Sequence, residues 1–282
     1  MAAQRFADFV FRRRGRSAIW VDPSFASEAF IDLISDPDRL LELPDCEIIK
    51  DQSKIKVGCV LLGAADRQVR VYIKRYDAFS WRHRLVSIFF ASGAIRSLRG
   101  AVILADTGVA TARPIAAIEH RQGRFLSRSF YLTEEVAGSK IVNRIWLEDL
   151  AALGGAAGVH RRRDFLRGLS QLFARLHEKN IYHNDLKDFN ILAVPQGPGG
   201  AFGFFVLDLE GVRRFSALNR RRRIKNLVQI NRTLGKYLSR SQRMRFLRSY
   251  LGSISSDAQQ RKLWARQIEQ ASRALDLQKV AI

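Results

Sequence analysis

A short polar stretch, residues 183–190, has the side chains and spacing needed to move a phosphoryl group onto a hydroxyl. It reads HNDLKDFN. The Asp185 carboxylate could accept the proton of the attacking hydroxyl, and the Asn190 amide oxygen could reach a metal ion on the phosphates. Lys187 between them could offset charge on the transferred group. The structural alternative is a polar turn between a helix and a strand, with Asp185 as a cap.

A second carboxylate follows an apolar stretch further along the chain. Residues 204–207 are apolar and lead into Asp208, with a glycine three residues later. This pattern predicts a strand that places Asp208 beside Asn190. Two hard oxygen ligands together with phosphates suit Mg²⁺, so these two residues are the expected metal ligands. Glu210 could be a further ligand or a charge at a helix start, and we favour the helix start.

Both segments resemble kinase motifs. The first resembles the catalytic loop H-R-D-L-K-x-x-N, with Asn184 where arginine usually stands. Asp208 resembles the aspartate of the D-F-G motif, with Leu209 and Glu210 in place of phenylalanine and glycine.

Lys74 ends an alternating strand pattern, residues 69–73, and resembles the lysine of the kinase V-A-I-K strand. It would then contact nucleotide phosphates, whereas the alternative is a lysine on a solvated strand face. Kinases orient this lysine with a glutamate on the next helix, but no Glu stands between residues 77 and 119. Ser97 falls near the expected position, and Asp106 or a carboxylate from another segment could substitute.

Two further segments are candidates for nucleotide contacts. The turn between the first two expected strands lacks G-x-G-x-x-G, but Ser53, Lys54 and backbone N–H groups could cover phosphates. Glu134, Glu135 and Val136 follow an apolar strand and resemble the kinase hinge, whose backbone donor and acceptor bind adenine. The alternative for the second segment is a surface turn.

The elements that must hold these side chains change along the chain from strands to helices. Residues 46–73 are β-rich and predict a meander of strands. Helical spacing of apolar residues predicts helices over 79–105 and 163–178, the second leading into the catalytic loop. The first is either an amphipathic helix on the sheet or a membrane-facing basic surface. Residues 213–282 also read as helices, with an arginine run at 220–223 that is either solvated or a site for an acidic substrate.

Charge and composition restrict the partners. The chain has 282 residues, 47% of them hydrophobic, and a net charge of +21. Such a field favours an anionic partner: nucleic acid, an acidic membrane surface or a phosphorylated glycolipid. Two cysteines indicate no disulfide framework. The N-terminus does not read as a secretory signal, and no apolar run is long enough to span a bilayer. Its basic and aromatic residues are either a docked extension or a foot on an anionic surface.

Taken together, these segments resemble the lipopolysaccharide core heptose and Kdo kinases of Gram-negative bacteria (InaA/WaaP-like). The resemblance covers roughly residues 45–252, and its phrases are KDQSKIKV, RVYIKRYD, GVATARP, YLTEEVAG, IYHNDLKDFNIL, VLDLEGVR and NLVQINRTL. It implies an α+β, bilobal protein-kinase-like fold with an antiparallel-sheet N-lobe and a mainly helical C-lobe. The expected division is an N-terminal extension 1–45, an N-lobe 46–133, a hinge 134–139 and a C-lobe 140–282.

The resemblance also implies a reaction, which is ATP- and Mg²⁺-dependent phosphorylation of an inner-core sugar hydroxyl at the cytoplasmic face of the inner membrane. The implied partners are the lipopolysaccharide core or a lipid A precursor and the anionic inner-membrane surface. By position, Asp185 would be the catalytic base, Lys187 a neighbour of the γ-phosphate, and Lys74 a ligand of the α and β phosphates. Asn190 and Asp208 would hold Mg²⁺.

Three other functions remain open from the sequence. Lys187 is typical of protein kinases and Glu210 of small-molecule kinases, so another acceptor on the same fold is one alternative. The missing helix glutamate is the only support for a pseudokinase scaffold. Charge alone suggests a nucleic-acid binder, but no RRM, KH or zinc-finger phrase is present, so no specific nucleic acid is expected.

Overall fold

The computed structural model describes residues 6–64, 67–77, 90–197, 200–252 and 257–280. The chain forms two compact units. Unit 1 comprises Met1–Val102 and Ala112–Val136, and unit 2 comprises Ile103–Thr111 and Ala137–Ile282. Within the described ranges, no helix is both long enough and apolar enough to cross a membrane.

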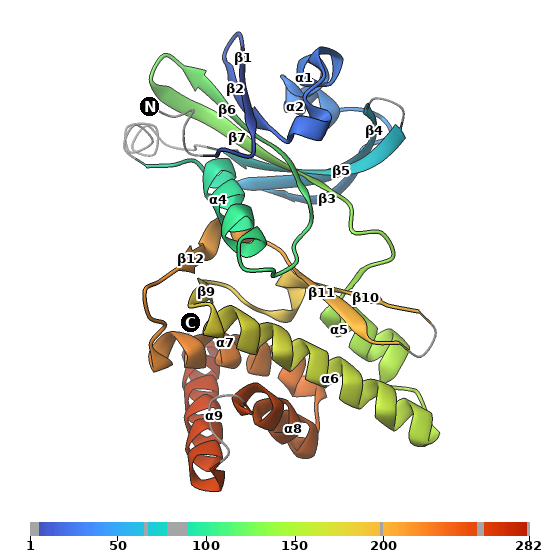
Figure 1. Cartoon of the computed structure of the whole chain (residues 1–282), viewed down its shortest axis with the longest axis vertical. Coiled ribbons are helices and arrows are strands. Elements are labelled where there is room, and N and C mark those ends of the chain that lie inside the picture. The colour runs from blue at the N-terminus through green and yellow to red at the C-terminus, as the bar shows by residue number, and fades with distance from the viewer. Residues whose placement is uncertain (1–5, 65–66, 78–89, 198–199, 253–256, 281–282) are drawn as a thin grey trace. The chain divides into compact units, whose positions relative to one another are not determined.

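Unit 1 is built on a seven-stranded antiparallel sheet (Figure 1), with the strand order β1-β2-β6-β7-β5-β4-β3. The expected meander forms its β3-β4-β5 part. Lys74 lies in β5, where it pairs with Tyr131 of β7. The strands are β1 (Val10–Arg14), β2 (Ser17–Val21), β3 (Glu47–Gln52), β4 (Ile55–Ala64), β5 (Arg67–Asp77), β6 (Pro114–Gln122) and β7 (Phe125–Glu134).

The two faces of this sheet are covered by different helices (Figure 1). Successive residues of a strand point to opposite faces, so neighbouring residues contact different helices. Val71 and Ile73 of β5 are fully buried on the face that packs against α1 (Glu28–Ile34) and α2 (Pro37–Leu40). Tyr131 lies on the other face, in a cluster with residues of α4 (Gly93–Ala105). Lys74 pairs with Tyr131 and therefore stands on the α4 side of the sheet.

The expectation that residues 1–45 form an extension outside the N-lobe is wrong for the described part of that segment. β1 and β2 are strands of the same sheet, and β2 pairs with β6 along its whole length. The second correction concerns residues 103–111, which belong to unit 2 although we expected them in the N-lobe. Both pieces are placed by contacts with distant parts of the chain, which local patterns do not reveal.

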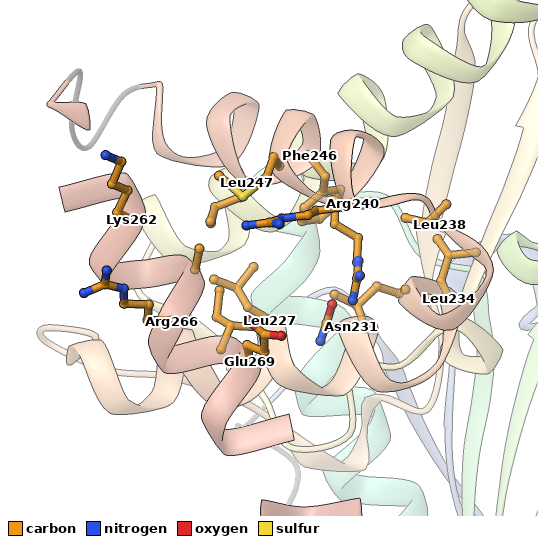
Figure 2. A pocket seen from close by; sticks show the side chains of 16 residues that line it. Leu227, Asn231, Leu234, Leu238, Arg240, Phe246, Leu247, Lys262, Arg266 and Glu269 are labelled. Carbon is orange, nitrogen blue, oxygen red and sulfur yellow. The ribbon is translucent and has the colours of Figure 1, made fainter. Parts of the chain in front are cut away.

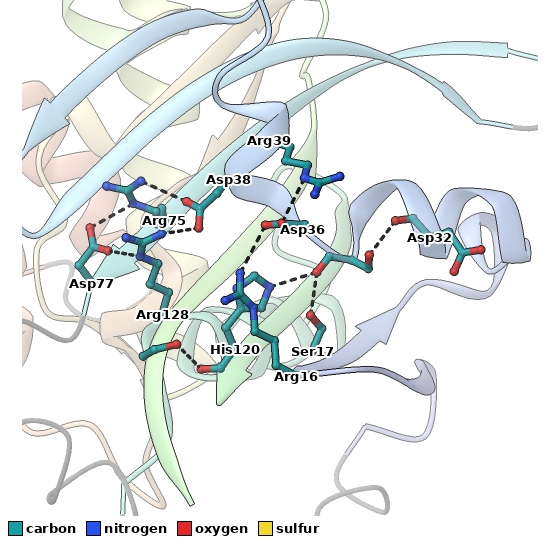
Figure 3. Close-up of polar contacts among 12 residues, drawn as sticks. Arg16, Ser17, Asp32, Asp36, Asp38, Arg39, Arg75, Asp77, His120 and Arg128 are labelled. Atoms are coloured by element: carbon teal, nitrogen blue, oxygen red, sulfur yellow. Dashed lines mark hydrogen bonds and ion pairs between the residues drawn. The ribbon is translucent and has the colours of Figure 1, made fainter. Parts of the chain in front are cut away.

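Charged groups fasten α2 to the sheet (Figure 3). Asp38 accepts hydrogen bonds from Arg75 of β5 (3.1 Å) and Arg128 of β7 (2.6 Å). Atoms of Asp36, Asp38 and buried His120 lie within 4.8 Å of one another, as in a metal site. However, two guanidinium groups already neutralise Asp38, which disfavours a cation there. Burial lowers the pKa of His120, so it is a neutral neighbour. The cluster therefore anchors the N-terminal segment and fixes β5 next to Lys74.

Unit 2 is mainly helical (Figure 1), with short strands around the polar loop. The predicted core helix is α6, which begins eight residues earlier than expected, at Gly155. The elements of unit 2 are β8 (Lys140–Ile141), α5 (Val142–Arg144), the π-helical turn η3 (Ile145–Leu150), α6 (Gly155–Glu178), β9 (Ile181–His183), η4 (Asp188–Asn190), β10 (Ile191–Pro195), β11 (Phe202–Val206), η5 (Leu209–Gly211), β12 (Val212–Arg214), α7 (Arg220–Arg232), η6 (Leu234–Tyr237), α8 (Arg240–Leu251) and α9 (Ala258–Val280).

The helix predicted over 79–105 is shorter at its N-terminal side, where residues 90–92 are not helical. α4 begins at Gly93, where Ser92 caps it by accepting a hydrogen bond from the amide of Ile95 (3.2 Å). The part of the prediction that covers residues 79–89 lies outside the described residues.

Candidate active site

The polar loop is delivered by α6 and held by short strands on either side. After α6, β9 runs into His183 and pairs with β12, so that His183 faces Val212. The amide of Asn184 donates to the carbonyl oxygen of Gly211 (3.1 Å). A Cβ on Gly211 would lie 2.9 Å from the Asn184 Cβ, so only glycine allows this close approach without a shift. The two predicted segments thus meet at the Asn184–Gly211 contact.

Within the loop, three of the predicted site residues are in direct contact. Lys187 Nζ lies 2.6 Å from Asp185 Oδ2. Asn190 Nδ2 donates to the main-chain oxygen of Asp185 (2.8 Å) and to its Oδ2 (3.2 Å). The amide nitrogen of Asn190 is therefore used within the loop, and its Oδ1 is the atom that suits a metal ion.

Asp208 is joined to this group through the backbone. The amide of Leu207 donates to the carbonyl oxygen of Asn190 (2.9 Å), and β10 pairs with β11 just beyond. Asp208 itself has a left-handed backbone, with φ 57° and ψ 56°. Such a conformation is uncommon outside glycine but is tolerated by aspartate, and it is often found at functional sites. The structure thus brings Asp185, Lys187, Asn190 and Asp208 to one part of unit 2.

His183 ties the loop to the segment that precedes Asp208. Its ring is buried, with Nε2 donating to the carbonyl oxygen of Leu207 (2.9 Å) and Nδ1 accepting from the amide of Asp185 (3.1 Å). Desolvation lowers the pKa of His183, which keeps the ring neutral, as this donor and acceptor pattern requires. Both ring nitrogens are engaged, so His183 holds the loop in place.

Sequence reasoning missed a third set of residues, which lie on α7 and reach the loop from the side. Asn226 Nδ2 donates to the carbonyl oxygen of His183 (2.6 Å). Thr233 Oγ1, next to the end of α7, accepts from the amide of Asp188 (3.4 Å). Lys225 Nζ donates to the side chain of Asn184 (3.2 Å), the residue that replaces the usual arginine. The available signal was a polar stripe at helical spacing in the apolar phrase NLVQINRTL.

The predicted nucleotide-binding residues all lie in unit 1, whereas Asp106, a candidate substitute for the missing helix glutamate, lies in unit 2. Lys74 Nζ lies 4.9 Å from the centre of the Tyr76 ring, a cation–π distance. The Tyr76 hydroxyl is 2.9 Å from the hydroxyl of Ser97, which is buried in α4. At the helix position where a glutamate was sought, the structure therefore places a serine that holds an aromatic neighbour of the lysine.

The predicted hinge is engaged by arginines. Glu134 pairs with Arg67 (3.0 Å) and Glu135 with Arg70 (3.4 Å). The amides of Glu134 and Glu135 both donate to carbonyl oxygens within unit 1. Among the three hinge candidates, the amide of Val136 is therefore the one suited to donate to adenine.

The predicted phosphate-covering turn lies between β3 and β4. Ser53 and Lys54 are exposed there, as a covering turn requires. The carbonyl oxygen of Lys54 accepts from the amide of Asp77, which joins the turn to the end of β5 (3.2 Å).

Unit 2 also contains a cavity away from the loop, with a volume of about 530 Å³ (Figure 2). Its walls come from α7, η6, α8 and α9 and are largely apolar, with Leu227, Leu234 and Leu247 among them. Four cationic side chains also line it, against a single acidic one: Arg240, Arg243, Lys262 and Arg266, with Glu269. An apolar interior beside cations suits an apolar chain attached to an anionic group.

Comparisons with known proteins bear on both fold and family. A solved structure described as WaaP in complex with acyl carrier protein matches 88% of this chain and 97% of that chain, with a TM-score of 0.62 and 20% identity. This similarity confirms the expected α+β protein-kinase-like fold. No curated protein matches the chain. The model of the lipopolysaccharide kinase (Kdo/WaaP) family matches residues 72–250. Because that span is more than half of the chain, the protein belongs to the lipopolysaccharide kinase (Kdo/WaaP) family.

Proposed function

We propose that this protein is an ATP-dependent kinase that phosphorylates a sugar hydroxyl, of heptose or Kdo, in the lipopolysaccharide inner core. Family membership supports the reaction class and the lipopolysaccharide acceptor. The observation that carries the proposal is the contact of the Asp185 carboxylate with Lys187 and Asn190, in a loop bonded to the residue before Asp208.

In this proposal, Asp185 accepts the proton of the acceptor hydroxyl. Its Oδ2 is held by Lys187 Nζ and Asn190 Nδ2, which orients the carboxylate and leaves Oδ1 for the hydroxyl. Lys187 also supplies positive charge beside the transferred phosphoryl group. Catalysis then rests on positioning and charge neutralisation, as in other phosphoryl transfers.

The residues present fit a Mg²⁺ site. Asn190 Oδ1 and the Asp208 carboxylate are hard oxygen donors, and the hydrogen bond from Leu207 to Asn190 keeps their segments together. A bound Mg²⁺ would neutralise charge on the phosphates. In unit 1, Lys74 would bind the α and β phosphates, Ser53 and Lys54 would cover them, and the hinge 134–136 would hold adenine through the amide of Val136.

The acceptor is supported by charge as well as by family. With a net charge of +21, the protein is attracted to phosphates and carboxylates such as those of the lipid A and core region. The same charge favours peripheral binding at the anionic cytoplasmic face of the inner membrane. We propose this location together with the reaction.

A transfer assay with labelled ATP tests the proposal. The acceptors are core oligosaccharides that carry heptose or Kdo, with casein and an aminoglycoside for comparison. Asp185→Asn should lower turnover by about 10³-fold, because general-base catalysis contributes roughly this much. Asp164→Asn is the matched control, since Asp164 is an α6 residue that pairs only loosely with Arg167 (3.7 Å). Full turnover by Asp185→Asn, or transfer to casein or the aminoglycoside alone, would contradict the proposal.

We propose as a second candidate function that unit 2 binds an acyl carrier protein, with the acyl chain in the cavity of Figure 2. The support is the apolar wall with its four cationic side chains, and a structural neighbour described as a complex with acyl carrier protein. Titration calorimetry should show tighter binding of the acylated carrier than of the unacylated one. The double variant Arg240→Glu/Arg266→Glu should weaken the binding of both carrier forms, because it reverses the charge of two of the four cationic side chains. Equal affinity of the wild-type protein for the two carrier forms would contradict this proposal.

A further inference from the structure

The side chain of Gln229 on α7 reaches the loop on both sides of Asp185. Its Nε2 donates to the carbonyl oxygen of Asn184 (2.6 Å), and its Oε1 accepts from the amide of Leu186 (3.1 Å). Asn184 precedes Asp185 and Leu186 follows it, so one amide group holds the peptide units on either side. Both backbone torsions of Asp185 are thereby restrained, and with them the direction of its carboxylate.

The orientation of Gln229 is fixed by a buried neighbour. Asn226 Nδ2 donates to Gln229 Oε1 (2.8 Å) as well as to the carbonyl oxygen of His183 (2.6 Å). Asn226 is itself fully buried. A donor on Asn226 requires an acceptor on Gln229, so the amide oxygen must face Leu186 and the amide nitrogen must face Asn184.

A second histidine continues this chain of hydrogen bonds into the helices. His177 of α6 is fully buried, with Nε2 3.2 Å from Asn226 Oδ1 and Nδ1 2.8 Å from the hydroxyl of Tyr250 on α8. Burial lowers the pKa of His177 to about 4, so the ring is neutral. Because Asn226 Oδ1 can only accept, Nε2 carries the proton and Nδ1 accepts from Tyr250.

We infer that Gln229 is a positioning residue for the catalytic base and that Asn226 and His177 fix its orientation. The inference rests on the role proposed above for Asp185. Only a side chain with one donor and one acceptor at this reach satisfies both loop contacts. Glutamate has the same length but, when ionised, cannot donate to Asn184, and alanine makes neither bond. Gln229 thus sets the geometry of the base through the backbone on either side of it.

Steady-state kinetics of Gln229→Ala and Gln229→Glu test this inference, with Gln229→Glu keeping the side-chain volume. Each should lower kcat by about 10²-fold, the effect expected when a catalytic group is displaced by about 1 Å. The KM for ATP should stay within about twofold of wild type, since unit 1 and the proposed Mg²⁺ ligands are unchanged. Combined with Asp185→Asn, either change should give no further loss, because both act through the same group.

The control is Ser249→Ala, which removes a 2.6 Å hydrogen bond to buried Ser170 elsewhere in the helices. It should lower the melting temperature and leave kcat unchanged, which separates loss of stability from loss of positioning. Wild-type kcat in Gln229→Glu, or a further loss in the double variant, would overturn the inference. Wild-type turnover in Asp185→Asn alone would instead overturn the proposed function, so the two failures are distinguishable.

Discussion

At the scale of residues, local sequence spacing identified the loop side chains that contact one another. It missed the side chains of α7 that hold the loop in place. Asp185, Lys187 and Asn190 lie within six positions of one another, so their contacts follow from one short loop. Gln229 bonds to residues 43 and 45 positions earlier in the chain. No local pattern encodes such a pairing, although the polar stripe on α7 signals that this helix face does not pack against apolar side chains alone.

The buried His177 leads to a prediction about pH. Its pKa is lowered to about 4 in the folded chain, against 6.5 as the ordinary value. Above pH 6.5 the imidazole of His177 is neutral in both the folded and the unfolded chain, so the stability is fully present. Between pH 6.5 and 4 the unfolded chain takes up a proton that the folded chain does not, so stability falls, by on the order of 3 kcal/mol in total.

Urea unfolding at a series of pH values measures this loss. His177→Gln offers a donor and an acceptor but no titrating group, so its unfolding free energy should decline less steeply over the same pH range. Parallel curves for the two proteins would show that His177 is not the group responsible.

At the scale of elements, the pairing of two short strands helps to hold the loop. The pairing of β9 with β12 brings the segment after Asp208 against the loop, and Gly211 provides the closest point. The sequence predicted both segments but not the pairing of these three-residue strands, because such short strands have too few residues for a periodic pattern. Close backbone approach, rather than side-chain chemistry, explains the glycine.

Gly211→Ala should therefore disturb the catalytic loop by forcing apart the backbone segments that hold it. The new methyl group would stand 2.9 Å from the Asn184 Cβ, and the shift that relieves it costs about 1–3 kcal/mol. Thermal unfolding should show lower stability, and the kinase assay should show lower turnover. Gly252→Ala is the control, because its nearest contact is 3.4 Å and its φ is −53°. Equal melting temperatures for the two variants would contradict the prediction.

At the scale of the whole molecule, the fold class was predictable from motifs, but the extent of unit 1 was not. The basic segment at residues 10–14 does not alternate like a half-buried strand, yet it forms β1 beside β2. β2 pairs with β6, about a hundred positions later, and ion pairs of Asp38 fasten α2 to two strands. These long-range contacts explain why the N-terminal 45 residues looked like an extension in the sequence.

Helix α7 serves two neighbours at once. Asn226 and Gln229 turn toward the loop, whereas Leu227 and Ile230 turn toward the cavity of Figure 2. Successive residues of a helix are rotated by about 100° about its axis. Inserting or deleting one residue before this stretch would therefore turn the polar pair away from the loop and the apolar pair away from the cavity at the same time. The shape of the cavity can therefore change only through exchange of individual side chains on α7. A rotation of the whole helix would also break the hydrogen bonds that Asn226 and Gln229 make to the loop.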